Sequence, residues 1–336
     1  MKHSLELPSL PRACPELAEG EGPGEGLRQK KNHPMIQSLF PSDTTVLIQG
    51  ITGKEGARMT AWLVKSGVNV VGGVTPGKAG QTVEDRPVFD TVLDAKNAFP
   101  HCTTTSIVVP ASRVLGAVTE AIGAGMRFIH LLTEQIPVHD VIIMRKLVAE
   151  SQVTLLGPSS IGYLQYPKFR LGYLGGESPF ETITEGSTAV ISTSGGMTNE
   201  LMTSLARNGI GTRVAMALGG DRVIGTTLGD AVAFAEQLAE VKLIVCFVEP
   251  GRPFLKELLS SEHHLSKPLV LFLAGDALDA LPRGVAYGHT GTILGEGDAS
   301  ISETRDALRA HGIACVGTMS DCITEVKQFV TRDASL

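Results

Sequence analysis

The chain has 336 residues, of which 43% are hydrophobic and 19% charged, and its net charge is −6. This length suffices for two α/β domains, and the composition is that of an ordinary globular protein. The negative balance excludes the basic surface that nucleic-acid binding needs, and no apolar run is long enough to cross a membrane. Five scattered cysteines without a CxxC pair predict reduced thiols in a cytoplasmic protein, with neither a disulfide framework nor a metal site.

Residues 1–35 differ in composition from the rest of the chain. The stretch from Pro8 to Gly26 is rich in Pro, Glu and Gly and shows no apolar periodicity. It also lacks the basic-then-apolar order of a secretory signal. We therefore expect a disordered tail that has no targeting role and no chemistry.

From Thr44 onward, short apolar runs alternate with amphipathic stretches, which predicts parallel sheets covered on both faces. The strands expected in the first half are Thr45–Ile48, Val68–Val71, Ser106–Val109, Phe128–Leu132 and Val153–Leu156, with helices at Ala57–Ser66 and Ser112–Ala124. In the second half they are Ala189–Ser192, Val214–Leu218, Leu243–Val248, Leu269–Leu273 and Ala314–Gly317, with helices at Thr198–Asn208, Gly229–Ala239, Ser302–His311 and Ile323–Thr331. We place one α/β domain at 36–171, a Gly-, Glu- and Thr-rich connection at 172–186 and a second domain at 187–336.

The first expected strand leads directly into the glycine-rich turn Gly50–Gly56 (GITGKEG), and a helix follows. Glycines at such a turn either serve packing alone or let the backbone approach a pyrophosphate at the helix start. NAD binding predicts an acidic residue at the end of the second strand, where this chain has Gly72–Lys78 (GGVTPGK). The cation of Lys78 suits a phosphorylated ribose, as in CoA or NADP. This pattern disfavours NAD and keeps CoA open.

His289 differs from the other histidines because glycines surround it, in Gly288–Gly291 (GHTG). A flexible, uncrowded backbone suits an imidazole that is phosphorylated and must then swing or be approached closely. The motif alone is equally compatible with an ordinary histidine in a turn.

Two other segments favour the interpretation that His289 is phosphorylated. Ser194-Gly195-Gly196-Met197 lies between a strand and a helix, and the N–H groups of a helix start suit a phosphoryl group. Glu249 ends an expected strand, where a carboxylate can hold one imidazole nitrogen and leave the other to attack phosphorus. Each segment alone also fits ordinary loop chemistry. Together with His289 they predict a nucleophile, an orienting carboxylate and an anion cradle.

The order of these motifs resembles the α subunit of succinyl-CoA synthetase (succinate–CoA ligase) and the related part of ATP-citrate lyase. The likeness runs from about Thr44 to Val330. The segments that carry it are Gln49–Gly56, Val71–Gly80, Thr133–Pro137, Gly219–Asp221 and Gly288–Gly291. The resemblance implies an α/β protein in which a Rossmann-like CoA-binding domain precedes a flavodoxin-like, doubly wound ligase domain.

The resemblance also implies the roles of particular residues. CoA would be held by Thr52, Gly53, Lys54, Glu55, Lys78, Leu132, Thr133 and Glu134. His289 would be the phosphohistidine and Glu249 its partner. A separate ATP-grasp β subunit would bind ATP or GTP with Mg²⁺, and the substrate would be a small carboxylic acid. The nucleotide would phosphorylate His289, the acid would take the phosphoryl group as an acyl phosphate, and the CoA thiol would then release phosphate.

The chain departs from the succinate enzymes in several of these segments. Thr193 stands where their Ser-Arg-Ser-Gly motif has arginine, and Asn199 stands where they have tyrosine. Gly157–Ser160 (GPSS) replaces their Gly-Pro-Asn-Cys, and Glu249 has lost its usual flanking residues. The residues for phosphoryl transfer are therefore present, whereas the acid-binding residues have changed.

These departures leave the acid open. Asn199 gives space and hydrogen-bonding groups, which favours a malate- or citrate-like acid. Thr193 removes a cation that such an acid needs, although Arg222 or Arg252 could supply one. We expect a succinate-type ligase with succinate as the default acid, and a citrate-type ligase and a CoA-binding subunit without turnover are the alternatives that the sequence leaves open.

Overall fold

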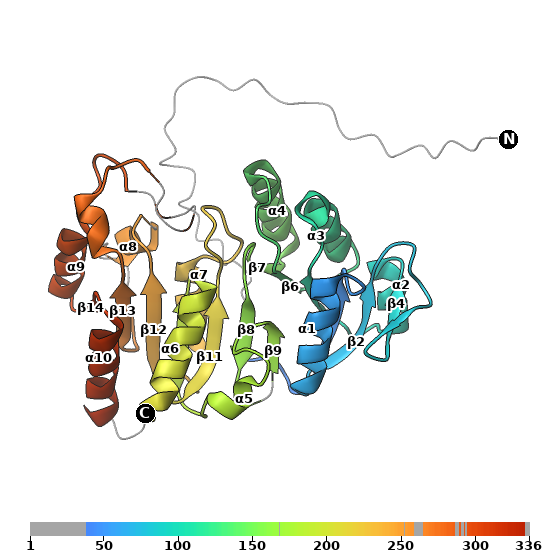
Figure 1. Ribbon diagram of the computed structural model, residues 1–336, viewed down its shortest axis with the longest axis horizontal. Coiled ribbons are helices and arrows are strands. Elements are labelled where there is room, and N and C mark those ends of the chain that lie inside the picture. The colour runs from blue at the N-terminus through green and yellow to red at the C-terminus, as the bar shows by residue number, and fades with distance from the viewer. Residues whose placement is uncertain are drawn as a thin grey trace. The chain divides into compact units, whose positions relative to one another are not determined.

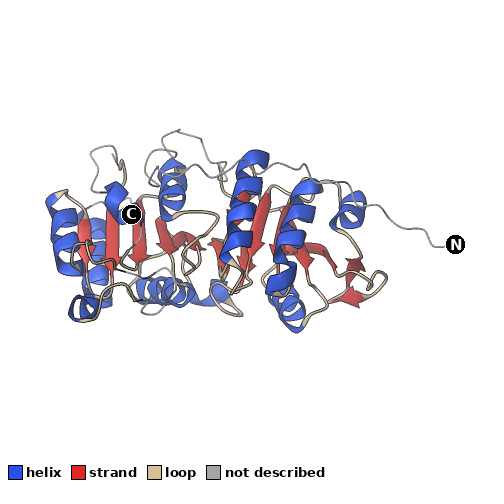
Figure 2. Cartoon of the chain, turned by 90° about the horizontal axis from the view of Figure 1, so that it is seen from above, coloured by secondary structure: helices blue, strands red, loops and turns tan. Residues whose placement is uncertain are grey.

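The computed structural model describes residues 38–167, 169–251, 253–258, 265–285, 289, 292 and 294–332. The tail expected over residues 1–35 lies outside this description, as do Arg252 and the neighbours of His289 in its motif, Gly288, Thr290 and Gly291. The described residues form two seven-stranded sheets with helices on both faces (Figures 1 and 2). None of the described helices is long and apolar enough to span a membrane.

The first sheet is parallel except at one edge. Its strands in spatial order are β3 (Thr82–Val83), β4 (Arg86–Phe89), β2 (Asn69–Val74), β1 (Thr45–Gln49), β5 (Thr104–Ile107), β6 (Phe128–Leu131) and β7 (Thr154–Leu156). Its helices are α1 (Lys54–Lys65), α2 (Val92–Ala98), α3 (Val114–Gly123) and α4 (Val138–Ser151). Only β3, paired with β4, runs antiparallel among the described strands of this sheet. Every residue of β5 and β6 is buried, as expected for parallel strands that helices cover on both faces.

The second sheet has a parallel part and an antiparallel hairpin. Its strands in spatial order are β14 (Ala314–Val316), β13 (Leu269–Leu273), β12 (Leu243–Val248), β10 (Thr188–Ser192), β11 (Thr212–Ala217), β8 (Gly162–Gln165) and β9 (Phe169–Gly172). Its helices are α5 (Pro179–Thr182), α6 (Gly195–Arg207), α7 (Leu228–Gln237), α8 (Pro253–Leu258), α9 (Ile301–Ala310) and α10 (Met319–Arg332). The two doubly wound α/β halves expected from the sequence are confirmed.

The chain enters the second sheet earlier than the sequence pattern indicates. The pattern assigns residues up to 171 to the first domain, but β8 pairs antiparallel with β11 and β9 pairs with β8. Both strands are only four residues long, and short runs of this kind do not reveal their partners. The hairpin therefore extends the second sheet while it follows the last strand of the first sheet in the sequence.

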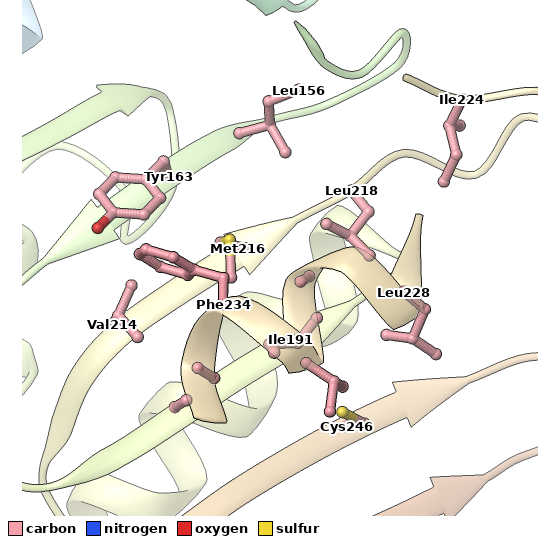
Figure 3. Close-up of a cluster of buried hydrophobic side chains, with 14 of the residues drawn as sticks. Leu156, Tyr163, Ile191, Val214, Met216, Leu218, Ile224, Leu228, Phe234 and Cys246 are labelled. Atoms are coloured by element: carbon pink, nitrogen blue, oxygen red, sulfur yellow. The ribbon is translucent and has the colours of Figure 1, made fainter. Parts of the chain in front are cut away.

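The core of the second half packs α7 against the central strands (Figure 3). Leu228 and Phe234 of α7 are buried in one cluster with Ile191 of β10, Met216 of β11 and Cys246 of β12. Burial raises the pKa of the Cys246 thiol, which is free and stays protonated, so it packs as a small apolar group. This core holds the carboxyl ends of β10, β11 and β12 at one edge of the sheet.

A buried histidine joins the first sheet to the chain segment that leads into the second. His130 of β6 lies 3.0 Å from Ser106 Oγ through Nδ1 and 2.9 Å from the Ser160 carbonyl oxygen through Nε2. Burial lowers its pKa to about 4, so the ring is neutral at neutral pH. Because a carbonyl can only accept, Nε2 carries the proton and Nδ1 accepts from the Ser106 hydroxyl. His130 thus has a packing role and no role in the candidate site.

Candidate functional site

The glycine-rich turn after β1 requires glycine at two of its positions. Gly50 has a φ of +85°, and a Cβ there would lie 2.7 Å from the carbonyl oxygen of Val108. A Cβ at Gly56 would lie 2.1 Å from the Gly50 carbonyl oxygen. The turn therefore packs directly against both the strand beside it and the first turn of α1.

The start of α1 is open to a ligand. Gly53 is its N-cap residue, and no side chain among the described residues caps its first turn. Thr52 and Gly53 line a cavity of about 560 Å³ at the carboxyl ends of β1, β2 and β5. Because the N–H groups of a helix start are unpaired and carry partial positive charge, this cavity suits a phosphate group. Lys54 and Glu55 follow Gly53 and contribute their N–H groups to the same turn.

Lys78 and Arg113 both lie at the carboxyl edge of the first sheet, and the sequence pattern singled out only Lys78 of these two cations. Lys78 lies in the turn after β2, where its N–H donates to Asp90 Oδ1 at 3.0 Å and its side chain is exposed. Lys78 does not line the cavity, whereas Arg113, just after β5, does. Among the described lining residues Arg113 is the only cation. Its position at the carboxyl edge of a predicted parallel sheet was the signal that could have identified it.

The Glu55 carboxylate does not face this cavity. It accepts a hydrogen bond from Arg58 and lies 3.1 Å from the hydroxyl of Tyr173, which follows β9. The resemblance implied that Glu55 contacts CoA, and because Glu55 is not among the described residues that line the cavity, its main-chain N–H at the helix start is the group that suits such a contact. A carboxylate turned away from a phosphate site also avoids repulsion between like charges.

The segment Leu132–Glu134 follows β6 and leads to a second cavity, of about 540 Å³. The Thr133 hydroxyl donates to the Val109 carbonyl at 2.7 Å, which fixes this segment beside the end of β5. Glu134 lines the cavity, and the Ser159 hydroxyl lies 3.4 Å from its Oε1. The same cavity is lined by Asp221, Arg222 and His289. A segment expected to contact CoA and the expected phosphohistidine thus share one cavity.

His289 and Glu249 are paired. Nδ1 of His289 lies 2.7 Å from Oε1 of Glu249, which directly follows β12. The Glu249 side chain is 14% exposed and that of His289 41%. Because a carboxylate accepts hydrogen bonds, the pair places the proton on Nδ1. Nε2 then keeps its lone pair and is free to act as a nucleophile.

Gly220 makes room for this imidazole. A Cβ at Gly220 would lie 2.3 Å from Cδ2 and 3.0 Å from Nε2 of His289. Real Cβ atoms do not approach other atoms so closely, so any larger residue would displace the ring from its position. The sequence pattern identified Gly220 only as part of a motif.

The start of α6 lies at the same edge of the sheet as Glu249 and Gly220. Ser192 of β10 is in register with Ala217 of β11 and with Phe247 of β12, and neighbouring strands are about 4.8 Å apart. Ser194 is the N-cap of α6, and its Oγ accepts from the Met197 N–H at 3.5 Å. A Cβ at Gly195 would lie 2.7 Å from the Ile161 side chain, whereas Gly196 is exposed beside open space.

Thr193 and Asn199, which the sequence linked to the acid-binding site, have no polar group that points into the His289 cavity among its described lining. The Thr193 side chain is buried, and its hydroxyl has no hydrogen-bond partner among the described residues. Asn199 Oδ1 accepts a hydrogen bond from the Gly175 N–H at 2.8 Å, and Asn199 is not among the described residues that line the His289 cavity. Arg222 lines that cavity, whereas none of the residues expected to hold the phosphoryl group or the acid does so: Ser194, Gly195, Gly196 and Asn199.

Comparison with known proteins also divides the chain into two parts, which correspond to the two sheets. Residues 41–135 match the family model of a CoA binding domain, and residues 185–329 match that of a succinyl-CoA ligase like flavodoxin domain. The succinate–CoA ligase [ADP-forming] subunit alpha 1 of Archaeoglobus fulgidus is 34% identical over 296 residues, which are 88% of this chain and 99% of the relative. The chain belongs to the succinate–CoA ligase α-subunit family. As a family member, it is an α-type subunit of an acid–CoA ligase.

Other family members and solved structures extend the comparison. The Staphylococcus aureus α subunit is 32% identical over 84% of this chain and 91% of its own length. ATP citrate lyase from Methanothrix soehngenii, solved with citrate and coenzyme A, has a TM-score of 0.79 at 22% identity, over 89% of this chain. An acetyl-coenzyme A synthetase from Ca. Korarchaeum cryptofilum has a TM-score of 0.63 at 19% identity, over 83% of this chain. This chain covers 52% and 59% of those two solved chains, which share its fold.

Proposed function

We propose that this family member carries phosphate on His289 and, with an ATP-grasp β subunit, joins a small carboxylic acid to CoA. The observation that carries the proposal is the 2.7 Å pair of His289 Nδ1 and Glu249 Oε1 beside the cavity that Glu134 also lines. Its test is whether His289 takes up phosphate from ATP or GTP when the β subunit is present. The β subunit would bind the nucleotide with Mg²⁺.

The chemistry divides into three displacements. Nε2 of His289 attacks the γ-phosphorus and the nucleoside diphosphate leaves, while Glu249 stabilises the positive charge that forms on the ring. A carboxylate oxygen of the acid then attacks the phosphorus and His289 leaves, which gives an acyl phosphate. The CoA sulfur attacks the acyl carbon and phosphate leaves. The N–H groups of Gly195 and Gly196, in the first turn of α6, suit the phosphate in these steps, whereas the Ser194 N–H already donates to Ser192 Oγ at 2.9 Å.

CoA would occupy the cavity at the start of α1, with its diphosphate on the first-turn N–H groups. Arg113 lines that cavity and would bind the diphosphate, whereas Lys78 lies farther along the sheet edge and would bind the ribose phosphate. The thiol end would extend along Leu132–Glu134 towards the cavity that contains His289.

Two variants separate these phosphate contacts. Loss of a charge-assisted contact should weaken binding about ten- to a hundredfold. We expect Lys78→Ala to weaken CoA much more than dephospho-CoA in calorimetric titrations, since only CoA carries the ribose phosphate. Arg113→Ala should weaken both ligands equally. Lys146→Ala removes an exposed lysine that pairs with Glu150, and it is the control that should leave both affinities unchanged. If Lys78→Ala weakens CoA and dephospho-CoA equally, Lys78 does not bind the ribose phosphate. If Arg113→Ala leaves both affinities unchanged, Arg113 does not bind the diphosphate.

We propose Arg222 as the residue that binds the second carboxylate of the acid. It is the only cation among the described residues that line the His289 cavity, and Thr193 supplies no charge. A carboxylate brought beside Glu134 and Asp221 needs such a cation to offset their repulsion. The acid would therefore be a dicarboxylate, with succinate as the first candidate.

A comparison of two acids tests this role. Arg222→Met should lower kcat/KM for succinate about ten- to a hundredfold and should change it little for butyrate, which has one carboxylate. Phosphorylation of His289 by the nucleotide should be unchanged, because it precedes binding of the acid. Equal losses for both acids would show that Arg222 does not bind the second carboxylate. A screen that includes malate and citrate also tests the citrate-type alternative.

A further inference from the structure

The hairpin β8–β9 of the second sheet and the loop after it hold α1 of the first sheet along its length. The Tyr173 hydroxyl, just after β9, lies 2.7 Å from the carbonyl oxygen of Glu55 in the first turn of α1. The last turn of α1 is held by Arg170, whose Nη2 donates to the Trp62 carbonyl oxygen at 2.7 Å. Beyond it, Lys65 Nζ lies 2.6 Å from Glu177 Oε1. Three contacts from one segment therefore reach both ends of the helix. The ribbon of α1 lies beside β9 in Figure 1.

The Arg170 contact carries the largest desolvation cost of the three, because its charged side chain is fully buried. Burial lowers its pKa to about 10, so it is still charged at neutral pH. Its guanidinium donates to carbonyl oxygens: those of Trp62, Leu174, Gly176 and Glu177. A buried cation on the last carbonyls of α1 also complements the negative end of the helix dipole. Arg170 fixes α1 and the 174–177 loop to each other.

Tyr173 acts at the opposite end of α1, where the phosphate site lies. Its ring stacks under the Arg58 guanidinium at 4.8 Å, and its hydroxyl accepts a hydrogen bond from Arg58 Nε at 3.5 Å. The same hydroxyl lies beside the carboxylate and the carbonyl of Glu55. This contact keeps the Glu55 side chain away from the cavity while its N–H stays in the open first turn.

We propose that Tyr173 is a positioning residue for CoA, which holds the first turn of α1 so that its N–H groups point at the CoA phosphates. The proposal rests on the function proposed above and adds that the CoA site is incomplete without a residue from the loop that follows the hairpin β8–β9 of the second sheet. CoA affinity then depends on a side chain that lies outside the first domain and that touches no part of the ligand.

Tyr173→Phe in the full-length chain isolates this effect, because it removes only the hydroxyl. We expect the Kd for CoA, measured by calorimetry, to rise about three- to tenfold, as for the loss of one or two hydrogen bonds. The rate of His289 phosphorylation with the β subunit should be unchanged, which shows that the variant is folded. Tyr166→Phe is the matched control, since Tyr166 lies in the turn of the same hairpin and packs on Phe180; it should bind CoA like the wild type.

A second variant shows whether the effect passes through the contact. Arg58→Met should also raise the Kd for CoA. The double variant Tyr173→Phe with Arg58→Met should bind CoA no more weakly than the weaker of the two single variants, since both substitutions disrupt the same contact with Glu55. Wild-type affinity in Tyr173→Phe would overturn the proposal. So would an equal rise in Tyr166→Phe, or a fall in His289 phosphorylation that matches the loss of CoA binding. If the wild-type chain binds no CoA, the proposed function fails and this inference fails with it.

Discussion

Gly220→Ala is expected to slow phosphorylation of His289 about a hundredfold, which is the typical cost of a misplacement of about 1 Å in a reacting group. The added methyl group would lie 2.3 Å from Cδ2 of the ring, so the imidazole must move. Any movement large enough to relieve this contact lengthens the 2.7 Å bond to Glu249. The ring then loses the partner that fixes its tautomer and stabilises its charge.

The same variant should fold normally. His289 is 41% exposed, so its ring can turn towards solvent at little cost to packing. We therefore expect an unchanged thermal midpoint and an unchanged Kd for CoA, next to a large fall in the phosphorylation rate. Gly123→Ala in α3 is the matched control, because a Cβ there meets open space. A Gly220→Ala chain that is phosphorylated at the wild-type rate would show that the observed position of the ring does not matter.

The sequence pattern predicts the central strands better than the edges of the sheets. Expected strands such as 189–192 and 243–248 agree closely with β10 and β12, because strands buried on both faces are continuous apolar runs. The helix α4 was missed, since Val138 and Ile142 are exposed apolar residues that blur its pattern. The hairpin β8–β9 was missed because its partner β11 lies far along the chain.

The sequence predicts those parts of the candidate site in which a single residue and its neighbours already indicate a particular chemistry. His289 between glycines and Glu249 at a strand end are visible in the sequence, and they lie within hydrogen-bonding distance. Three other features depend on distances that no local pattern contains: Arg113 in the cavity of the glycine turn, Gly220 against the imidazole, and Tyr173 on the first turn of α1. Asn199 shows the opposite case, because its carboxamide oxygen accepts a hydrogen bond from the Gly175 N–H and Asn199 does not line the described part of the His289 cavity.

The most direct test of the account follows the phosphoryl group itself. The chain is incubated with the proposed ATP-grasp β subunit and γ-labelled ATP or GTP, and the labelled residue is located by peptide mapping. We expect the label on His289, in a bond that is labile in acid and stable in base, as a phosphoimidazole is. His289→Asn should carry no label while it binds CoA with nearly wild-type affinity, because the proposed CoA site lies mainly in the first domain. A stable label on the His289→Asn chain would show that His289 is not the residue that carries the phosphoryl group.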